Sequence, residues 1–220
     1  MTAEPRFDAL VVDFGGVLTT PLQTAMVAFA QEMGIEMQHL VRAALGGYMG
    51  GEDALVFDFE TGKISEEEFC TEFARRLGEY SGTPVDPSGL VTRMFSELAL
   101  EESMFAAVES ARRAGLKTGL LSNSWGTGLY PHDRLADAFD VSVISGEVGL
   151  RKPDPAIFEL TTARLGVAAE RCVFVDDHPG HLASAAEAGM TTVLHREPAR
   201  TIEELEALLG VPLRAPAEGG

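Results

Sequence analysis

Residues 9–18 read Ala-Leu-Val-Val-Asp-Phe-Gly-Gly-Val-Leu, an apolar run that reaches one carboxylate and then breaks on two glycines. Val11 and Val12 are β-branched and the run is short, so we predict a buried strand rather than a helix. Ligands of open α/β sheets bind in the crevice beyond the carboxyl ends of the strands. Asp13 is therefore predicted to stand at that edge. An isolated Asp at a strand end is commonly a turn former or a helix cap, so the rest of the chain has to decide its role.

The segment after this strand, residues 20–96, has a helical pattern throughout. Its apolar residues recur at helical spacing, and its Met and Phe stripes are typical of core packing. Ser65 and Glu68 have the spacing of a capping box, which predicts a helix that begins there and ends at Gly78. A further helix is predicted over residues 91–98. We therefore expect this segment to form a small helical bundle inserted directly after the first strand.

The remainder of the chain alternates between short apolar runs and helical patterns. Alternating βα units imply a parallel sheet with helices on both faces. Thr201 and Glu204 have the spacing of a second capping box, at the start of the last helix. Strands are predicted at residues 116–121, 141–144, 172–175 and 191–194, with helices between them.

The expected fold is therefore α/β: a Rossmann-like, doubly wound parallel sheet core with an inserted helical cap domain. The core is discontinuous and takes residues 1–19 and 97–213, and the cap takes residues 20–96. Residues 214–220 are rich in Pro, Ala and Gly, and we expect this tail to fray.

The composition narrows the class of protein and its partners. A formal net charge of −17 over 220 residues repels nucleic acid and anionic membranes, so we expect neither as a partner. No apolar window of about 20 residues marks a membrane span, and residues 1–7 lack a secretory pattern. Cys70 and Cys172 match no metal or redox spacing, which favours reduced packing residues in a cytoplasmic protein. A monomer and a homodimer both remain open.

Carboxylates follow two of the predicted strands at the point where each ends: Asp13 after one, and Asp176 with Asp177 after another. Two or three carboxylates at one edge of a sheet repel each other unless a cation shares them. Mg²⁺ fits best, because it prefers oxygen ligands and needs only one or two carboxylates plus a substrate phosphate. The sequence therefore predicts a Mg²⁺ site at this edge.

Groups that suit a phosphate come to the same edge. Ser122 and Asn123 end another strand and can donate hydrogen bonds to phosphate oxygens, while Lys152, in a Pro-bounded loop, can supply a positive charge. An Asp in such surroundings can act as a nucleophile and form an aspartyl-phosphate that water then cleaves. Each group alone has an ordinary interpretation as a turn, a helix start or solvated surface. Their joint occurrence at strand ends favours a catalytic site.

Four motifs in this order resemble the haloacid dehalogenase-like hydrolases, in particular the phosphatase-type branch with a helical cap inserted after the first strand. The stretch ETGKIS at 60–65 also resembles the cap of a subgroup that includes sugar-phosphate phosphatases and the phosphatase domain of soluble epoxide hydrolase. The resemblance covers the chain from about residue 7 to residue 195. The four motifs are DFGGV at 13–17, LSN at 121–123, KPD at 152–154 and FVDD at 174–177.

This resemblance implies roles for the charged residues of the site. Asp13 matches the nucleophile and a Mg²⁺ ligand of the family. Lys152 matches the residue that steadies the nucleophile and the phosphoryl group. Asp177 matches the metal-binding carboxylate, and Asp176 matches either a further ligand or a partner that orients the ligands.

The resemblance also implies how a phosphate is held. Ser122 matches the phosphate-binding hydroxyl, with Asn123 beside it and Gly16 as a further phosphate contact. The implied substrate is a small phosphorylated metabolite.

One position departs from the family pattern. Most phosphatases of the family carry a second Asp two places after the nucleophile, as general acid and then base, and Gly15 stands there in this chain. The Gly15 carbonyl can still ligate Mg²⁺, but no side chain remains to protonate the leaving oxygen, a contribution of about 10²–10⁴-fold in rate. Some members that resemble this chain, including a phosphatase acting on glucose 1-phosphate, also lack that Asp. Slow turnover or an undemanding leaving group is therefore expected, rather than inactivity.

Two histidines flank the predicted metal ligands. His178 is a candidate substitute proton carrier, since imidazole titrates near neutrality. For His181 we favour helix-start polarity and hydrogen bonding to a metal-binding group. Trp125 and His132 follow the second motif and are expected to shape the substrate pocket.

The leading hypothesis is a Mg²⁺-dependent phosphatase of a small phosphorylated metabolite. A metal-independent 2-haloacid dehalogenase is the alternative, since it also uses an Asp nucleophile without a second Asp, but the pair Asp176 and Asp177 argues against it. A non-catalytic binding protein on the same fold is the third hypothesis.

Overall fold

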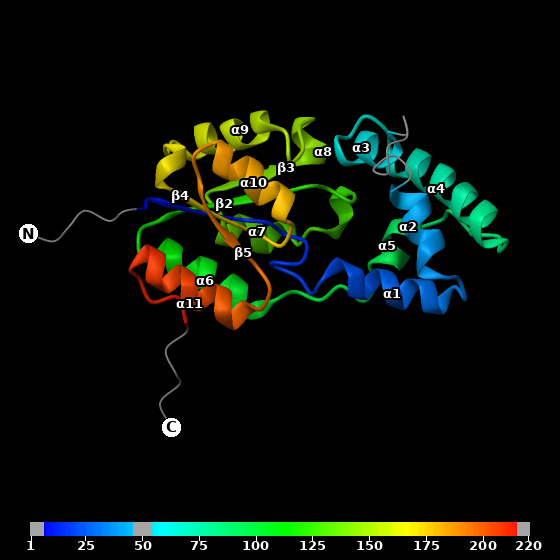
Figure 1. Cartoon of the computed structure of the whole chain (residues 1–220), viewed down its shortest axis with the longest axis horizontal. Helices are drawn as coiled ribbons and strands as arrows, with labels where there is room; N and C mark the ends of the chain where they lie inside the picture. The colour runs from blue at the N-terminus through cyan, green and yellow to red at the C-terminus, as the bar shows by residue number, and fades with distance from the viewer. Residues whose placement is uncertain (1–6, 46–53, 215–220) are drawn as a thin grey trace, which may run out of the picture.

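The computed structural model describes residues 7–45 and 54–214 and shows an α/β fold around one parallel sheet (Figure 1). Its strand order is β3-β2-β1-β4-β5. The predicted buried strand is the central one, and all four of its residues are buried. The strands are β1 (Ala9–Val12), β2 (Lys117–Ser122), β3 (Val141–Ile144), β4 (Cys172–Asp176) and β5 (Thr191–Leu194).

Parallel pairing brings the carboxyl ends of three strands to one edge of the sheet. Val12 of β1 pairs with β2 on one side and with Val175 of β4 on the other. The backbone N–H of Asp13 donates to the Val175 carbonyl at 2.9 Å, which continues the pairing beyond the end of β1. Asp13, Ser122 and Asp176 therefore leave the sheet side by side, as the sequence predicts.

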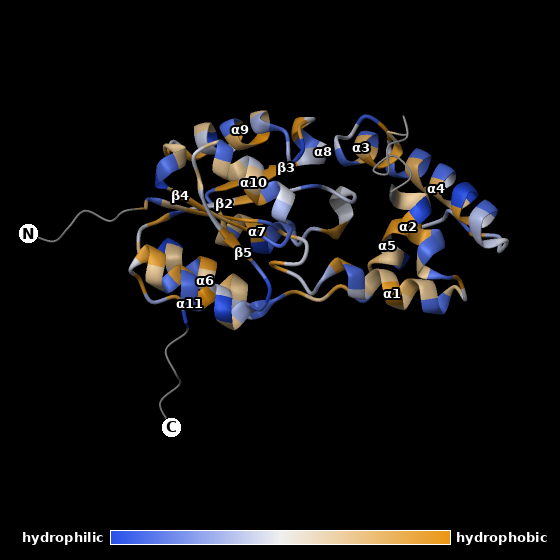
Figure 2. Ribbon diagram, in the orientation of Figure 1, coloured by the Kyte–Doolittle hydropathy of each residue, from blue (hydrophilic) through white to orange (hydrophobic). Residues whose placement is uncertain are grey.

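Helices cover both faces of the sheet, as the alternating pattern predicts; they are α6 (Glu102–Arg113), α7 (His132–Ala138), α9 (Pro155–Leu165), α10 (Pro179–Glu187) and α11 (Pro198–Leu209). Leu10 and Val12 share one hydrophobic cluster with α6, α7 and α11. Ala9 and Val11 share another with α9 and α10. Figure 1 shows these layers on either side of the strands, and Figure 2 shows the strands as nearly continuous hydrophobic segments.

A second group of helices, which we call the cap, follows β1 and lies at one end of the molecule (Figure 1). It consists of α1 (Leu22–Glu32), α2 (Met37–Leu45), α3 (Leu55–Glu60), α4 (Glu66–Ser81) and α5 (Leu90–Met94). The cap has its own hydrophobic cluster, in which Phe69, Phe73 and Leu77 are fully buried. The expected boundaries after residues 19 and 96 stay predictions. Of the tail expected to fray, residues 215–220 lie outside the described residues.

The first predicted capping box is confirmed, but its helix is longer than expected. The backbone N–H of Ser65 donates to Glu68 Oε2 at 2.8 Å, and the Ser65 hydroxyl accepts from the backbone N–H of Glu68. The helix continues through Gly78 to Ser81, so the predicted end at Gly78 is wrong. A glycine inside a helix costs only about 1 kcal/mol, whereas Gly82 adopts a left-handed φ of 73° that ends the helix.

The second predicted capping box is wrong. Helix α11 begins at Pro198, whose missing N–H costs nothing in the first turn, and Thr201 lies inside the helix. The Thr201 hydroxyl pairs with His195 Nδ1 at 2.9 Å. The helix predicted over residues 91–98 is also shorter, since α5 ends at Met94. The sequence did not predict three short segments: η1 (Thr127–Leu129), α8 (Ser145–Val148) and η2 (Ala169–Arg171).

The structure agrees with two expectations drawn from composition. Within residues 7–45 and 54–214, no helix combines the length and apolar character that crossing a membrane requires. Cys70 and Cys172 are free thiols, and both are buried as packing residues.

Candidate active site

Three of the predicted site residues form a buried ionic network at the carboxyl edge of the sheet. Lys152 Nζ lies 2.9 Å from Asp13 Oδ1 and 2.7 Å from Asp176 Oδ2. The side chains of Lys152 and Asp176 are 0% exposed, and that of Asp13 is 10% exposed. Burying an ion is unfavourable unless it is paired, so each member of the network depends on the others.

The network has more negative than positive charge, because Lys152 faces three carboxylates. Burial raises the pKa of Asp13 to about 7; Lys152 opposes this shift, and the nearby Asp176 and Asp177 add to it. Burial lowers the pKa of Lys152, but Asp13 and Asp176 outweigh burial and hold the amine charged. Burial raises the pKa of Asp176, but Lys152 and His181 outweigh burial and hold it below its ordinary value. A further cation would therefore stabilise Asp13 most.

The third carboxylate gives the site the donor set of a hard cation. One carboxylate oxygen from each of Asp13, Asp176 and Asp177 lies within 4.8 Å of the others. Asp176 is already engaged by the chain: Oδ1 accepts from the backbone N–H of His178 at 2.7 Å and lies 3.1 Å from His181 Nδ1. Asp13 and Asp177 are thus better placed to bind an ion. Oxygen donors of this kind fit Mg²⁺.

The Gly15-Gly16 turn fits tightly between the site and the cap. Gly16 has a φ of 77°, and a Cβ there would collide with the carboxylate of Asp177, so this position requires glycine. Its backbone N–H donates to Thr19 Oγ1 at 3.0 Å. Gly15 has no positive φ, but a Cβ there would lie 3.1 Å from Leu22 Cδ1. Leu22, the first residue of α1, therefore closes the space beside the missing acid.

Asn123 holds Lys152 in place. Its Oδ1 accepts from the backbone N–H of Lys152 at 2.8 Å, and its Nδ2 donates to the Lys152 carbonyl at 3.0 Å. From the sequence we predicted that this amide donates to phosphate. In the structure, both of its polar atoms form hydrogen bonds with the backbone of Lys152 instead. Asn123 thus orients the loop that carries the charge.

Ser122 is buried, and its hydroxyl lies 2.9 Å from the hydroxyl of Tyr130. Sequence reasoning missed Tyr130, because it lies in a loop where no motif or periodicity marks it. Burial raises the pKa of Tyr130 to about 12, so the phenol keeps its proton and can orient the serine hydroxyl. The Tyr130 ring packs against Phe14, with ring centroids 4.8 Å apart.

The two histidines lie beside the end of β4. His181 Nδ1 is 3.1 Å from both carboxylate oxygens of Asp176, which is the hydrogen-bonding role favoured from sequence. His178 is exposed and caps the start of α10 from the position before Pro179, where its Nδ1 accepts from the backbone N–H of Gly180 at 3.2 Å. The two rings are 4.5 Å apart. The role of His178 as a proton carrier stays a prediction.

Trp125 connects the core to the cap. Its ring packs edge-on against Phe69 and Phe95 of the cap cluster, at centroid distances of 5.9 and 5.6 Å. Trp125 also lines a narrow pocket together with Gly15 and Ser122, and its role in shaping a substrate pocket stays a prediction. His132, which was also expected to shape the pocket, is exposed and does not line it; its ring centroid is 6.2 Å from that of Tyr130.

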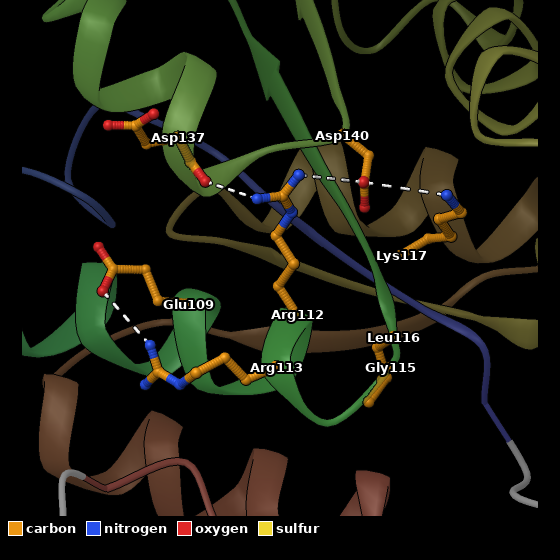
Figure 3. Close-up of a pocket in the computed structure, with 8 residues that line it drawn as sticks. All are labelled: Glu109, Arg112, Arg113, Gly115, Leu116, Lys117, Asp137 and Asp140. Carbon is orange, nitrogen blue, oxygen red and sulfur yellow. Dashed lines mark hydrogen bonds and ion pairs between the residues drawn. The ribbon is translucent and has the colours of Figure 1, made fainter.

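A wider hollow, of about 610 Å³, lies at the opposite edge of the sheet (Figure 3). Its charged groups are Lys117 at the start of β2, Asp140 before β3, and side chains of α6 and α7. None of the predicted site residues lines it. The size of a hollow therefore does not locate the chemistry in this molecule.

The geometry at the carboxyl edge agrees with a match to a known family. A model described as haloacid dehalogenase-like hydrolase covers residues 7–189. The chain belongs to the haloacid dehalogenase-like hydrolases. A phosphatase of Mycobacterium tuberculosis is 32% identical to this hydrolase over 194 residues, which cover 84% of this chain and 86% of that protein.

Two longer proteins contain a region similar to this hydrolase. Acyl-CoA dehydrogenase family member 10 of Mus musculus is 33% identical over 213 residues, and bifunctional epoxide hydrolase 2 of Sus scrofa is 31% identical over 219 residues. The matches cover 94% and 93% of this chain. The chain spans only 20% and 39% of the length of those two proteins.

Solved structures share the fold of this hydrolase. A HAD-like family hydrolase from Porphyromonas gingivalis superposes with a TM-score of 0.68 at 25% identity and covers 93% of this chain and 98% of its own. A HAD family enzyme from Bacteroides thetaiotaomicron, in complex with magnesium and inorganic phosphate, gives a TM-score of 0.65 at 22% identity, with coverages of 86% and 94%.

Proposed function

We propose that this hydrolase is a Mg²⁺-dependent phosphatase that acts on a small phosphorylated metabolite through an aspartyl-phosphate on Asp13. The observation that carries the proposal is the fixed carboxylate of Asp13. Lys152 Nζ at 2.9 Å and the backbone N–H of Phe14 at 2.7 Å both donate to its Oδ1. The relative from Mycobacterium tuberculosis is named a phosphatase, and the Bacteroides enzyme holds magnesium and phosphate, which supports the same chemistry here.

Asp13 and the side chains around it have separate roles in the proposed phosphoryl transfer. Asp13 attacks phosphorus, the bond to the leaving oxygen breaks, and water then cleaves the acyl-phosphate. The Lys152 amine offsets the negative charge on the phosphoryl oxygens. The Ser122 hydroxyl, oriented by Tyr130, donates a hydrogen bond to one of them.

The groups proposed to hold Mg²⁺ differ in part from those that would contact the phosphate. Asp13, Asp177 and the carbonyl of Gly15 would hold Mg²⁺, which when bound supplies positive charge next to the phosphate. Asp176 orients Lys152 and is a less direct partner of the ion, because its oxygens already accept from Lys152 and the backbone N–H of His178.

The absence of a carboxyl at Gly15 shapes the choice of substrate. With no acid there, cleavage depends on how well the leaving group carries negative charge. Anomeric sugar phosphates, acyl phosphates and aryl phosphates are therefore expected to react faster than simple alkyl phosphates. A flat dependence of kcat/KM on leaving-group pKa would mean that another donor supplies the proton, with His178 as the first candidate.

Release of inorganic phosphate from a panel of phosphate esters tests the proposed function. We expect release that chelation abolishes and that added Mg²⁺ restores. Activity that survives thorough chelation, together with halide release from a 2-haloacid, would identify a dehalogenase instead. No turnover of either class would identify a binding protein on this fold.

A further inference from the structure

A narrow pocket lies between the end of β2, the turn after Asp13 and side chains of the cap. At its inner end lie Ser122, Asn123 and Tyr130, which belong to the phosphate side of the site. The walls beyond them are apolar and come from both parts of the molecule. They are formed by Leu22 and Phe95, by Leu98 just after the cap, and by Trp125 and Leu129 of the loop after β2.

Among the described residues that line this pocket, none carries a charge. The polar groups at its inner end are not available to a leaving group: Ser122 pairs with Tyr130 and is assigned to the phosphate, and Asn123 pairs with the Lys152 backbone. A sugar brings several hydroxyls, and each one that loses water without gaining a partner weakens binding. The walls therefore suit an apolar group better than a polyol.

The position next to the nucleophile adds to this apolar character. Gly15 lines the pocket, and the Leu22 side chain lies 3.1–3.4 Å from where a Cβ of residue 15 would stand. An apolar methyl group thus borders the place where most family phosphatases have a carboxylic acid. The leaving group of a substrate bound here would therefore contact the apolar Leu22 side chain rather than an acidic side chain.

The charged side chains of residues 60–65, at the end of α3 and in the turn after it, form ion pairs outside the pocket. Glu60 is buried, and its Oε2 pairs with Arg151 Nε at 2.6 Å. Lys63 pairs with Asp58 at 3.2 Å on the surface. Although this stretch resembles that of sugar-phosphate phosphatases, it brings no charged side chain into the pocket lining.

The walls of the pocket lie close together. Leu22, Leu98, Trp125 and Leu129 are only half-buried, and they stand on three segments of the chain: the start of α1, the stretch after α5 and the loop after β2. The free space between them is about 20 Å³, room for roughly one water molecule. A group larger than one water molecule would have to replace contacts between the walls with contacts to itself, which favours a group of the same apolar chemistry.

We infer that the substrate is a phosphate monoester of an apolar alcohol, an aryl or alkyl group that lies between Leu22, Leu98 and Trp125. This inference rests on the proposed phosphatase function and narrows its substrate class. As Asp13 bonds to phosphorus, the bond between phosphorus and the alcohol oxygen breaks. The electron pair stays on that oxygen, which takes a proton from water, and the apolar alcohol leaves through the cap side.

A series of primary alkyl phosphates tests the inference, because the reacting bond stays the same while the apolar group grows. From ethyl through butyl to hexyl phosphate, kcat/KM is expected to rise by up to about fourfold for each methylene that the pocket buries. Glucose 6-phosphate, also a primary ester, is expected to react more slowly than hexyl phosphate. A flat series, or a preference for the sugar ester, would overturn the inference.

Acetyl phosphate separates this inference from the function on which it rests. It is activated and has almost no apolar surface, so its hydrolysis reports phosphatase chemistry alone. Hydrolysis of acetyl phosphate with a flat alkyl series would overturn only the apolar substrate class. If neither acetyl phosphate nor any ester of the series were hydrolysed, the proposed function and this inference would both be wrong.

A pair of variants places the effect in the pocket. Leu98→Asn adds a polar group to the wall and is expected to reduce the advantage of hexyl over ethyl phosphate by about tenfold or more. Leu100→Asn is the matched control, since Leu100 is 36% exposed and does not line the pocket. It is expected to keep the full advantage. Thermal melting confirms that both variants fold, and an unchanged ratio in folded Leu98→Asn would overturn the assignment.

Discussion

Both edges of the β-sheet carry a lysine that is paired with a carboxylate, but the two ionic clusters differ in burial. At the amino edge Lys117 lies 3.9 Å from Asp140, and its side chain is 55% exposed (Figure 3). At the carboxyl edge Lys152 lies between Asp13 and Asp176 and is 0% exposed. The amino edge also has the wider hollow.

The difference shows which property sets the proposed active site apart from the other edge of the sheet. Solvent screens exposed ion pairs, so they contribute about 0–1 kcal/mol and keep ordinary chemistry. Buried pairs cannot relax into water, so each charge depends on its neighbours, and the pKa of Asp13 rises to about 7. Burial of charge, rather than charge count or hollow size, therefore distinguishes the two edges.

The largest difference between the edges is expected in catalysis. Asp13→Asn should lower kcat by about 10⁴-fold or more, because a neutral amide neither attacks phosphorus nor forms the acyl-phosphate. Asp140→Asn, at the amino edge, should leave kcat within about twofold. Phosphate release gives both rates, and mass spectrometry of trapped wild-type protein should find the phosphoryl group on Asp13. A substantial rate in Asp13→Asn would move the site elsewhere.

The two lysines should also differ in stability. Lys152→Met leaves two buried carboxylates without their cation and is expected to lower the free energy of unfolding by about 3–5 kcal/mol. Lys117→Met removes only an exposed pair and should cost under about 1 kcal/mol. Urea unfolding measures both values. Equal losses would show that burial does not set the strength of these pairs.

The adjacent glycines of the turn after Asp13 allow a comparison within one edge of the sheet. Gly16→Ala combines a strained positive φ with a collision against Asp177 and should cost about 2 kcal/mol or more, with a loss of Mg²⁺ affinity. Gly15→Ala has no such φ and meets only the Leu22 side chain, so it should cost about 1 kcal/mol or less. Unfolding and Mg²⁺ titration of the two variants provide the measurement. A larger cost at Gly15 would contradict the geometry of the turn.

The buried pair of Glu60 and Arg151, outside the Lys152 network, should show the same effect of burial in its pH dependence. Burial raises the pKa of Glu60 from 4.5 to about 7, although Arg151 acts against the shift. Between these values the folded protein holds a proton that the unfolded chain has lost. The Glu60 contribution therefore lowers the free energy of unfolding as pH rises, by up to about 1.4 kcal/mol per pH unit.

Glu60→Gln cannot titrate, so it serves as the reference for this effect. The free energy of unfolding of the wild type minus that of the variant should fall between pH 4.5 and about 7. Urea unfolding across this range measures the difference, in which the titration of all other groups largely cancels. A difference that does not change with pH would show that Arg151 keeps the carboxylate charged throughout.

The sequence by itself determined the features that depend on local patterns. The apolar run at residues 9–12 predicted the central strand, because a strand buried on both faces must be apolar throughout. The capping box at Ser65 was recognisable because both of its partners lie within one turn. Parallel pairing then brought Asp13, Ser122 and Asp176 to one edge without further information.

Only the tertiary structure decided how these groups are held and what surrounds them. Asn123 was assigned to phosphate, yet it orients Lys152, 29 residues further along the chain. No sequence pattern marked Tyr130 or Leu22 as part of the site. Tyr130 matters because its hydroxyl contacts Ser122, and Leu22 matters because its side chain fills the space beside Gly15. Such contacts depend on how loops and the cap fold back over the sheet edge. Sequence spacing reports neighbours along a strand or helix, whereas these neighbours are set by packing between separate elements.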